Sequence, residues 1–190
     1  MDVHTWIEND LDSIRSKLND SVLSVIPQQR WVELADDGGS SVAHLLLHLA
    51  RHQDLAMATV IRDHPPLFDD HRSALGLSDA GPSAGLAERE DRALTTSLPL
   101  DALVSYAEGV FEATSTWLDR VDTAFLDTVP DTDRRLRDRA GLSVDDVGWL
   151  YRMWSDKPVW WMVQWPIIGH GHAHVGEAIS VRNRMGLSPF

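Results

Sequence analysis

Cysteine is absent from all 190 residues of the sequence. Its absence excludes disulfide bonds, thiolate metal ligands and cysteine nucleophiles, and with them several classes of enzyme. Any thiol chemistry would therefore need a thiol from outside the chain.

Long apolar runs are also lacking. The longest, PVWWMVQWPII at residues 158–168, is far shorter than the roughly 20 residues that cross a bilayer. The N-terminus begins with acidic and amphipathic residues, whereas a secretory signal begins with basic residues and a continuous apolar run. We therefore expect a cytoplasmic protein without a membrane span.

Positive charge is scarce. Lys and Arg total 17 against 29 Asp and Glu, so the net charge is -12, which repels nucleic-acid phosphates and anionic membranes. We expect the partners to be small-molecule substrates, and neither nucleic acid nor a membrane. Only Lys17 and Lys157 are lysines, a bias typical of GC-rich genomes.

The hydrophobic content of 43% is enough for one core, so residues 1–190 are expected to form a single domain. Apolar residues recur at steps of three and four in four segments, and no segment alternates as a strand does. The expected helices cover about 3–24, about 42–60, 99–121 and 155–185. Ser40 or Ser41 is expected to cap the second helix, and Ser155 or Asp156 the fourth, whose first turn contains Pro158. This pattern predicts an all-α, antiparallel four-helix bundle.

Two long connections remain between the expected helices. The crossover from His64 to Leu98 is either a lid over a site or a partly mobile surface segment with a short helix around 86–94. The arginine-rich stretch at 127–142 is expected to be a solvated connection. After it, Ser143 is expected to begin a short helix, with Asp146 at the capping-box position.

Two histidines lie inside the apolar stripe of the last expected helix. His170 and His174 are one turn apart, so their ring nitrogens can reach one metal ion. Two buried, unpaired imidazoles would cost free energy, which a metal ion offsets. Pro166 should kink this helix one turn before His170.

A third ligand is expected from the second helix, where His44, His48 and His52 follow one another at one-turn intervals. At about 100° per residue His48 faces furthest inward, and His44 is the alternative after a small rotation of the helix. His52 is less favoured because its sequence neighbours are polar.

The other histidines are not expected to bind the ion. His172 points about 160° away from the pair, towards the face of Trp161, Trp165 and Ile168. His4, His64 and His71 are expected to be solvated.

Glu177 lies one turn beyond His174 on the same face. It is expected to accept a histidine N–H or to act as a general base near the metal, unless it is an ordinary surface carboxylate.

The histidine segments SVAHLLLHLARHQD (41–54) and HGHAHVGEAISVRNRMGL (170–187) resemble the two metal motifs of the DinB/YfiT-like superfamily. The resemblance follows the helix order along the whole chain and implies a four-helix bundle with zinc, nickel or iron bound by one histidine of the second helix and an H-x-x-x-H pair of the last. Members of that superfamily include mycothiol-dependent and other thiol-dependent S-transferases. This chain departs from the pattern in its GHGHAH segment, and we expect no separate C-terminal domain of the kind found in the mycothiol-dependent isomerase.

Three histidines leave a divalent ion, most simply Zn²⁺, with an open position. Such a site could activate a low-molecular-weight thiol such as mycothiol for transfer to a small electrophile, or generate a hydroxide for hydrolysis. If a fourth protein ligand such as Glu177 closed the site, the ion would be structural or sensory in a non-catalytic, stress-related bundle. Arg51 or Arg182 could attract an anionic substrate.

Tryptophans are concentrated before and within the last helix, where they either wall an apolar pocket beside the metal or pack in the core. They are Trp149, Trp154, Trp160, Trp161 and Trp165. The last expected helix presents Val163, Ile167 and Val181 on one face and Trp161, Trp165 and Ile168 on another. This is more apolar surface than a monomer needs, so we expect a homodimer.

Overall fold

The structure, a computed structural model, describes residues 2–189, with Asp37 described through its backbone only. Within this range the chain is helical and contains no strand, which confirms the all-α prediction. No helix in the described part is long and apolar enough to cross a membrane.

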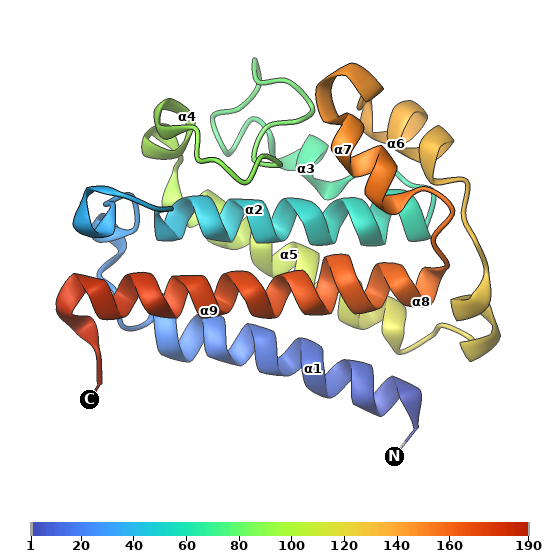
Figure 1. Cartoon of the computed structure of the whole chain (residues 1–190), viewed down its shortest axis with the longest axis horizontal. Helices are drawn as coiled ribbons and strands as arrows, with labels where there is room; N and C mark the ends of the chain where they lie inside the picture. The colour runs from blue at the N-terminus through green and yellow to red at the C-terminus, as the bar shows by residue number, and fades with distance from the viewer. Residues whose placement is uncertain (1, 190) are drawn as a thin grey trace.

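Four long helical segments make up the framework of the described chain (Figure 1). They are α1 (Val3–Leu18) continued by the π-helix η1 (Asn19–Leu23), α2 (Val42–Asp54) continued by the π-helix η4 (Leu55–Ile61), α5 (Leu100–Leu118), and the last segment, formed by α8 (Val159–Met162), the π-helix η6 (Val163–Gly169), α9 (His170–Arg182) and η7 (Asn183–Leu187). Helix α2 packs against α5 and α9, and α1 packs against the same two helices. These segments agree with the four helices that the periodicity predicts.

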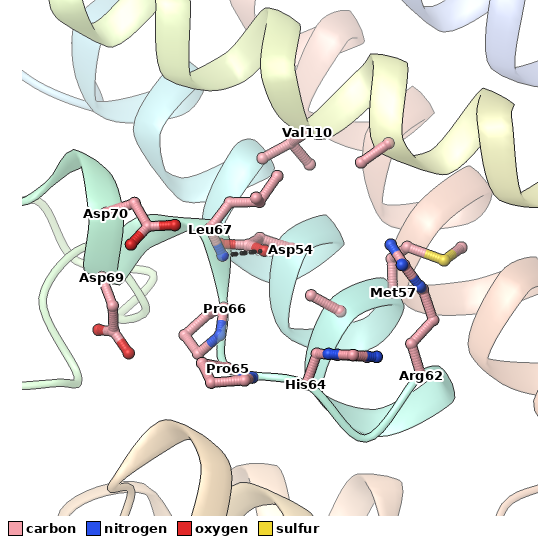
Figure 2. Close-up of a pocket in the computed structure, with 12 residues that line it drawn as sticks. Asp54, Met57, Arg62, His64, Pro65, Pro66, Leu67, Asp69, Asp70 and Val110 are labelled. Carbon is pink, nitrogen blue, oxygen red and sulfur yellow. Dashed lines mark hydrogen bonds between the residues drawn. The ribbon is translucent and has the colours of Figure 1, made fainter.

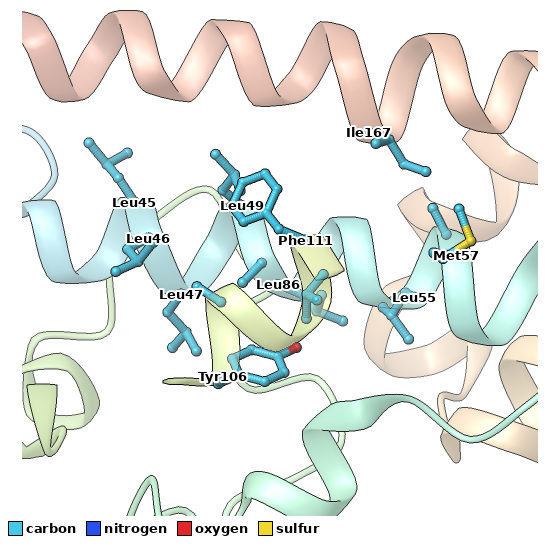
Figure 3. Close-up of a cluster of buried hydrophobic side chains, with 14 of the residues drawn as sticks. Leu45, Leu46, Leu47, Leu49, Leu55, Met57, Leu86, Tyr106, Phe111 and Ile167 are labelled. Atoms are coloured by element: carbon cyan, nitrogen blue, oxygen red, sulfur yellow. The ribbon is translucent and has the colours of Figure 1, made fainter. Parts of the chain in front are cut away.

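Helix α2 is buried on every side. All residues from Val42 to Ile61 are buried, although only part of the helix is apolar. Leu45, Leu49 and Ile167 fill the space between α2 and the last segment (Figure 3). Ser41 caps α2 by accepting the N–H of His44, as predicted.

The crossover covers the polar side of α2 and includes α3 (Leu67–His71) and α4 (Arg92–Ser97) (Figure 1). Arg51, 1% exposed, donates to the carbonyls of Ala84 (3.0 Å) and Pro82 (2.6 Å), and its guanidinium stacks 3.7 Å above the Phe68 ring. These contacts hold the crossover against α2. The short helix predicted around 86–94 is wrong, because α4 begins only at Arg92.

Asp54 holds the beginning of the crossover. Its carboxylate accepts the backbone N–H of Leu67 at 2.9 Å (Figure 2). It also accepts the backbone N–H of Phe68 at 2.9 Å and the Tyr106 hydroxyl at 2.8 Å. Burial raises the pKa of Asp54, and the nearby Arg51 partly opposes that shift.

The arginine-rich stretch is not a solvated connection. It contains η5 (Thr123–Asp127) and α6 (Thr132–Ala140), and Leu136 is fully buried. Arg134 and Arg139 donate to Asp63 at 2.7 and 2.8 Å, and these hydrogen bonds hold the pKa of Asp63 well below its usual range. The arginines therefore dock α6 onto the end of the second long segment.

The connection to the last segment confirms one predicted cap and corrects another. Helix α7 (Val144–Trp154) begins as predicted, because Ser143 accepts the N–H of Asp146. The last segment has no side-chain cap, since Pro158 itself occupies the capping position. Ser155 instead donates to Asp133 and to a backbone carbonyl.

Pro166 interrupts the α-helix, as its missing N–H predicts, and the chain forms the wider π-helical turn η6 around it. His170 begins α9 directly after that turn.

We predict that Arg51→Met lowers the free energy of unfolding by about 3–5 kcal/mol, because it leaves the carbonyls of Pro82 and Ala84 without their donor and removes the positive charge beside the buried Asp54. Urea unfolding followed by circular dichroism measures the loss. Arg137→Met is the matched control, since Arg137 is an exposed arginine paired only with its neighbour Asp138, and this change should cost less than about 1 kcal/mol. Equal losses in the two variants would contradict the role of Arg51.

Candidate metal centre

Three histidines and one glutamate converge from α2, α9 and the crossover. One ligand atom from each of His48, Glu88, His170 and His174 lies within 4.8 Å of the others, so the cluster could hold a metal ion. The three imidazoles are buried, whereas the side chain of Glu88 is 73% exposed. The cluster therefore has a rigid, buried side and a side that is open to solvent.

The distances between donor atoms suit a single ion. His170 Nε2 and His174 Nε2 are 3.0 Å apart. The two carboxylate oxygens of Glu88 lie 3.6 Å from His48 Nε2 and 4.0 Å from His174 Nε2. Nitrogen ligands about 2.0–2.1 Å from a zinc ion are separated by roughly these distances.

Hydrogen bonds at the far nitrogens orient two of the rings. His48 Nδ1 lies 3.0 Å from the carbonyl of Gly85, and His174 Nδ1 lies 3.2 Å from Glu177 Oε2. Both acceptors require the proton on Nδ1, which leaves the Nε2 lone pairs facing the cluster. His48 Nε2 is buried and has no hydrogen-bond partner among the described residues. The residues present therefore fit a divalent ion, which would satisfy this nitrogen.

Two of the three rings, His48 and His170, are held in the neutral form that binds metals. Burial lowers the pKa of His48 to about 4 and that of His170 to about 3, and the neighbouring His174 adds to both shifts. Both rings are uncharged near neutral pH, so neither has to release a proton before it binds an ion.

His44 and His52 lie beside the cluster and hold the crossover. His44 Nε2 donates to the carbonyl of Glu88 at 3.3 Å, and His52 Nε2 donates to that of Leu86 at 3.2 Å. His48 rather than His44 thus faces the other candidate ligands. The polar sequence neighbours of His52, Arg51 and Gln53, are buried, and so is His52 itself. The His52 ring lies 4.5 Å from that of His48.

The remaining histidines lie outside the cluster, as expected. His172 faces α1, where its Nε2 is 3.9 Å from the carboxylate of Asp10, and not the tryptophan face that its angle suggested. His71 is not simply solvated, because its ring lies 5.4 Å from that of Tyr106. His64 is exposed and lines a separate pocket (Figure 2).

The two glutamates occupy different places. Glu177 accepts the Nδ1–H of His174, behind the ring and away from the Nε2 atoms. This contact is the predicted acceptor arrangement. Glu88 lies on the ligand side, and the sequence analysis missed it. It belongs to an irregular segment without periodicity, AERED (87–91), which offers three acidic residues and no local rule for choosing among them.

Neither arginine proposed to attract an anionic substrate is free to do so. Arg51 binds the crossover carbonyls, and Arg182 is buried and donates to the carbonyl of Ser21 at 2.7 Å. Both are structural.

A small tryptophan pocket of about 50 Å³ adjoins the cluster. It is lined by His52, Glu88, Trp149, Met153, Trp154, Trp165, Pro166 and His170. Trp160 and Trp161 do not line it, so the five tryptophans divide between pocket wall and other surroundings.

No protein-family model, curated protein or solved structure matches the chain.

We predict that the purified protein binds one divalent transition-metal ion per chain. His48→Ala, His170→Ala and His174→Ala should each lower zinc content and affinity at least tenfold, because each removes one of three convergent nitrogens. Elemental analysis and competition with a chelating dye measure both quantities. The control is His172→Ala, which removes a histidine of α9 that faces α1 and should bind zinc as the wild type does. Full zinc content in the three cluster variants would refute the site.

The metal-free protein should lose stability as the pH falls from about 6.5 towards 5. His44, His48, His52 and His170 have pKa values lowered by burial from an unperturbed 6.5. Below pH 6.5 the unfolded chain therefore binds protons that the folded chain does not, at up to about 1.4 kcal/mol per pH unit for each histidine. Urea unfolding in a chelator at pH 7.5, 6.0 and 5.0 tests this. The slope should be shallower in His52→Gln, and a flat profile in the wild type would contradict the prediction.

Proposed function

We propose that the chain is a metal-dependent S-transferase that joins a low-molecular-weight thiol to small electrophiles. The observation that carries the proposal is the convergence of His48, His170 and His174 beneath an exposed glutamate. Three buried nitrogen ligands with one accessible side are typical of catalytic rather than structural zinc sites.

The proposal includes membership of the DinB/YfiT-like superfamily and an antiparallel four-helix bundle. The packing of α1 and α2 against both α5 and the last segment supports such a bundle, with the crossover between its second and third helices. The histidine positions also support it, with one on the second long segment and two, one turn apart, on the last. Zinc suits this donor set best, and nickel or iron is compatible with it.

Each residue of the site has a role in this proposal. His48, His170 and His174 hold the ion, while the Gly85 carbonyl and Glu177 fix the tautomers of His48 and His174. A bound divalent ion deprotonates a thiol that coordinates to it. Glu88 can move aside for the thiol, since most of its side chain is in solvent. Glu177 acts as a positioning residue, because it touches only the far side of His174.

A second candidate is a non-catalytic metal protein. The position of Glu88 favours it, because a carboxylate 3.6 Å from His48 Nε2 could close the coordination sphere as a fourth ligand. In that case the ion would stabilise the fold or report on metal supply. Hydrolysis at the same site is a third outcome that the assay below separates from the other two.

A homodimer remains part of the proposal, on different residues from those that suggested it. Val163, Ile167 and Val181 are buried within the chain and need no partner. The large apolar side chains that do reach the surface include Trp6 and Trp160, which line an apolar pocket of about 120 Å³ between α1 and the last segment. That face is where a second copy would bind.

The assay is zinc-loaded protein with monochlorobimane and, in separate reactions, mycothiol, bacillithiol and glutathione. The thiol sulfur forms a bond to the chloromethyl carbon, chloride leaves with its electron pair, and the thiol proton is released. We predict a zinc-dependent fluorescence increase with at least one thiol, reduced at least 100-fold in His174→Ala and unchanged in His172→Ala.

The other outcomes identify the alternatives. Cleavage of activated esters without a thiol would make the protein a hydrolase. If no reaction occurs with any thiol or ester while zinc remains bound, and Glu88→Gln weakens the zinc, the non-catalytic role would hold instead.

A further inference from the structure

Two pockets flank the histidine cluster at opposite ends of the row formed by His44, His48 and His52 on α2. His44 lines a pocket of about 350 Å³, and His52 lines the tryptophan pocket of about 50 Å³. The His44 and His48 rings stack 5.6 Å apart, and the His48 and His52 rings are 4.5 Å apart. The larger pocket is thus one ring away from the candidate ligand His48, whereas the tryptophan pocket is lined by the candidate ligand His170 itself.

The larger pocket has a mixed lining, with a greater polar share than the tryptophan pocket, and it carries a free positive charge. Its walls are small crossover residues and backbone between Ala80 and Thr95, with His44 on the helix side. Arg89 lines it, is exposed, and has no hydrogen-bond or ion-pair partner among residues 2–189. Asp91, the acidic residue that also lines the pocket, already accepts the N–H of Leu94 as the cap of α4. An unpaired arginine in a chain of net charge -12 is a specific place for an anionic group.

The smaller pocket is apolar and narrow. Trp154 is almost fully buried, whereas Met153 and Trp165 are exposed where the pocket reaches the surface. Since a cavity needs roughly 10–15 Å³ to hold one water molecule, about 50 Å³ admits a group of only a few heavy atoms. Its indole walls favour an apolar group over a charged one.

We infer that the two pockets divide the substrates of the proposed transferase. The Arg89 pocket takes a low-molecular-weight thiol that carries a carboxylate, and the tryptophan pocket takes the compact, apolar reacting end of the electrophile. The division rests on the proposed function and adds the substrate classes to it. It also ranks the three thiols of the assay, because glutathione and bacillithiol carry carboxylates and mycothiol does not.

Binding of matched thiols to the zinc-loaded protein tests the larger pocket. N-acetylcysteine and its amide differ only in the carboxylate, and calorimetry should show about fivefold tighter binding of the acid, the size of one solvent-exposed ion pair. Arg89→Ala should abolish this preference. Arg120→Ala, which removes another exposed arginine whose side chain has no hydrogen-bond or ion-pair partner in the described chain, should retain it. Equal binding of acid and amide to the wild type, or an unchanged preference in Arg89→Ala, would overturn the assignment.

Indole signals in the nuclear magnetic resonance spectrum of the zinc-loaded protein test the smaller pocket. Titration with bromoethane should shift the Nε1–H signals of Trp149, Trp154 and Trp165 and leave that of the buried Trp31 unchanged, with assignments from single Trp→Phe variants. If Trp149 and Trp154 do not respond, or if Trp31 responds equally, the tryptophan pocket does not bind the electrophile.

Both tests measure binding without turnover, so the inference and the proposed function can fail separately. Selective binding in both pockets without any thiol transfer would refute the transferase and leave the two binding sites. Thiol transfer that is retained while neither pocket shows its predicted selectivity would refute the division of substrates.

Discussion

The structure depends on one constraint: α2 is buried on all sides although one of its faces is polar. A buried imidazole, guanidinium or carboxylate costs several kcal/mol unless it is hydrogen-bonded. The crossover meets this requirement with backbone groups as it runs antiparallel to α2, so its path is set by the side chains it must satisfy. The carbonyls of Pro82 and Ala84 accept from Arg51, that of Gly85 from His48, that of Leu86 from His52 and that of Glu88 from His44.

Gly85 allows this close approach. Its φ of +77° is a left-handed conformation that glycine adopts without strain, and a Cβ added there would lie 2.8 Å from Cγ of Leu47. Any other residue would push the crossover outward and lengthen the 3.0 Å contact between its carbonyl and His48 Nδ1. The tautomer of a candidate metal ligand therefore depends on a glycine in a segment without regular structure.

This dependence explains which parts of the site the sequence could predict. His170 and His174 follow from helical periodicity alone, and His48 follows from its angle on an amphipathic helix, because such patterns are local. Glu88 does not, since its position is decided by hydrogen bonds between the crossover and α2. The prediction of a solvated connection at helix α6 is wrong for the same reason. Its arginines are paired by Asp63, which is distant in the sequence, so no local pattern indicates the contact.

The histidines of the cluster lie on helices and Glu88 lies on the crossover, and this difference bears on which functions the site could support. The candidate histidine ligands are fixed on helices packed into one core, so they could keep an ion bound while the fourth position changed. Glu88 is attached to the outer segment with its side chain in solvent, and the Glu88 carbonyl is tied to α2 only through His44. A carboxylate held in this way can exchange with a ligand without disturbing the three nitrogens. A fourth ligand buried among the helices could not, and this difference supports the proposal of an exchangeable ion over that of a purely structural one.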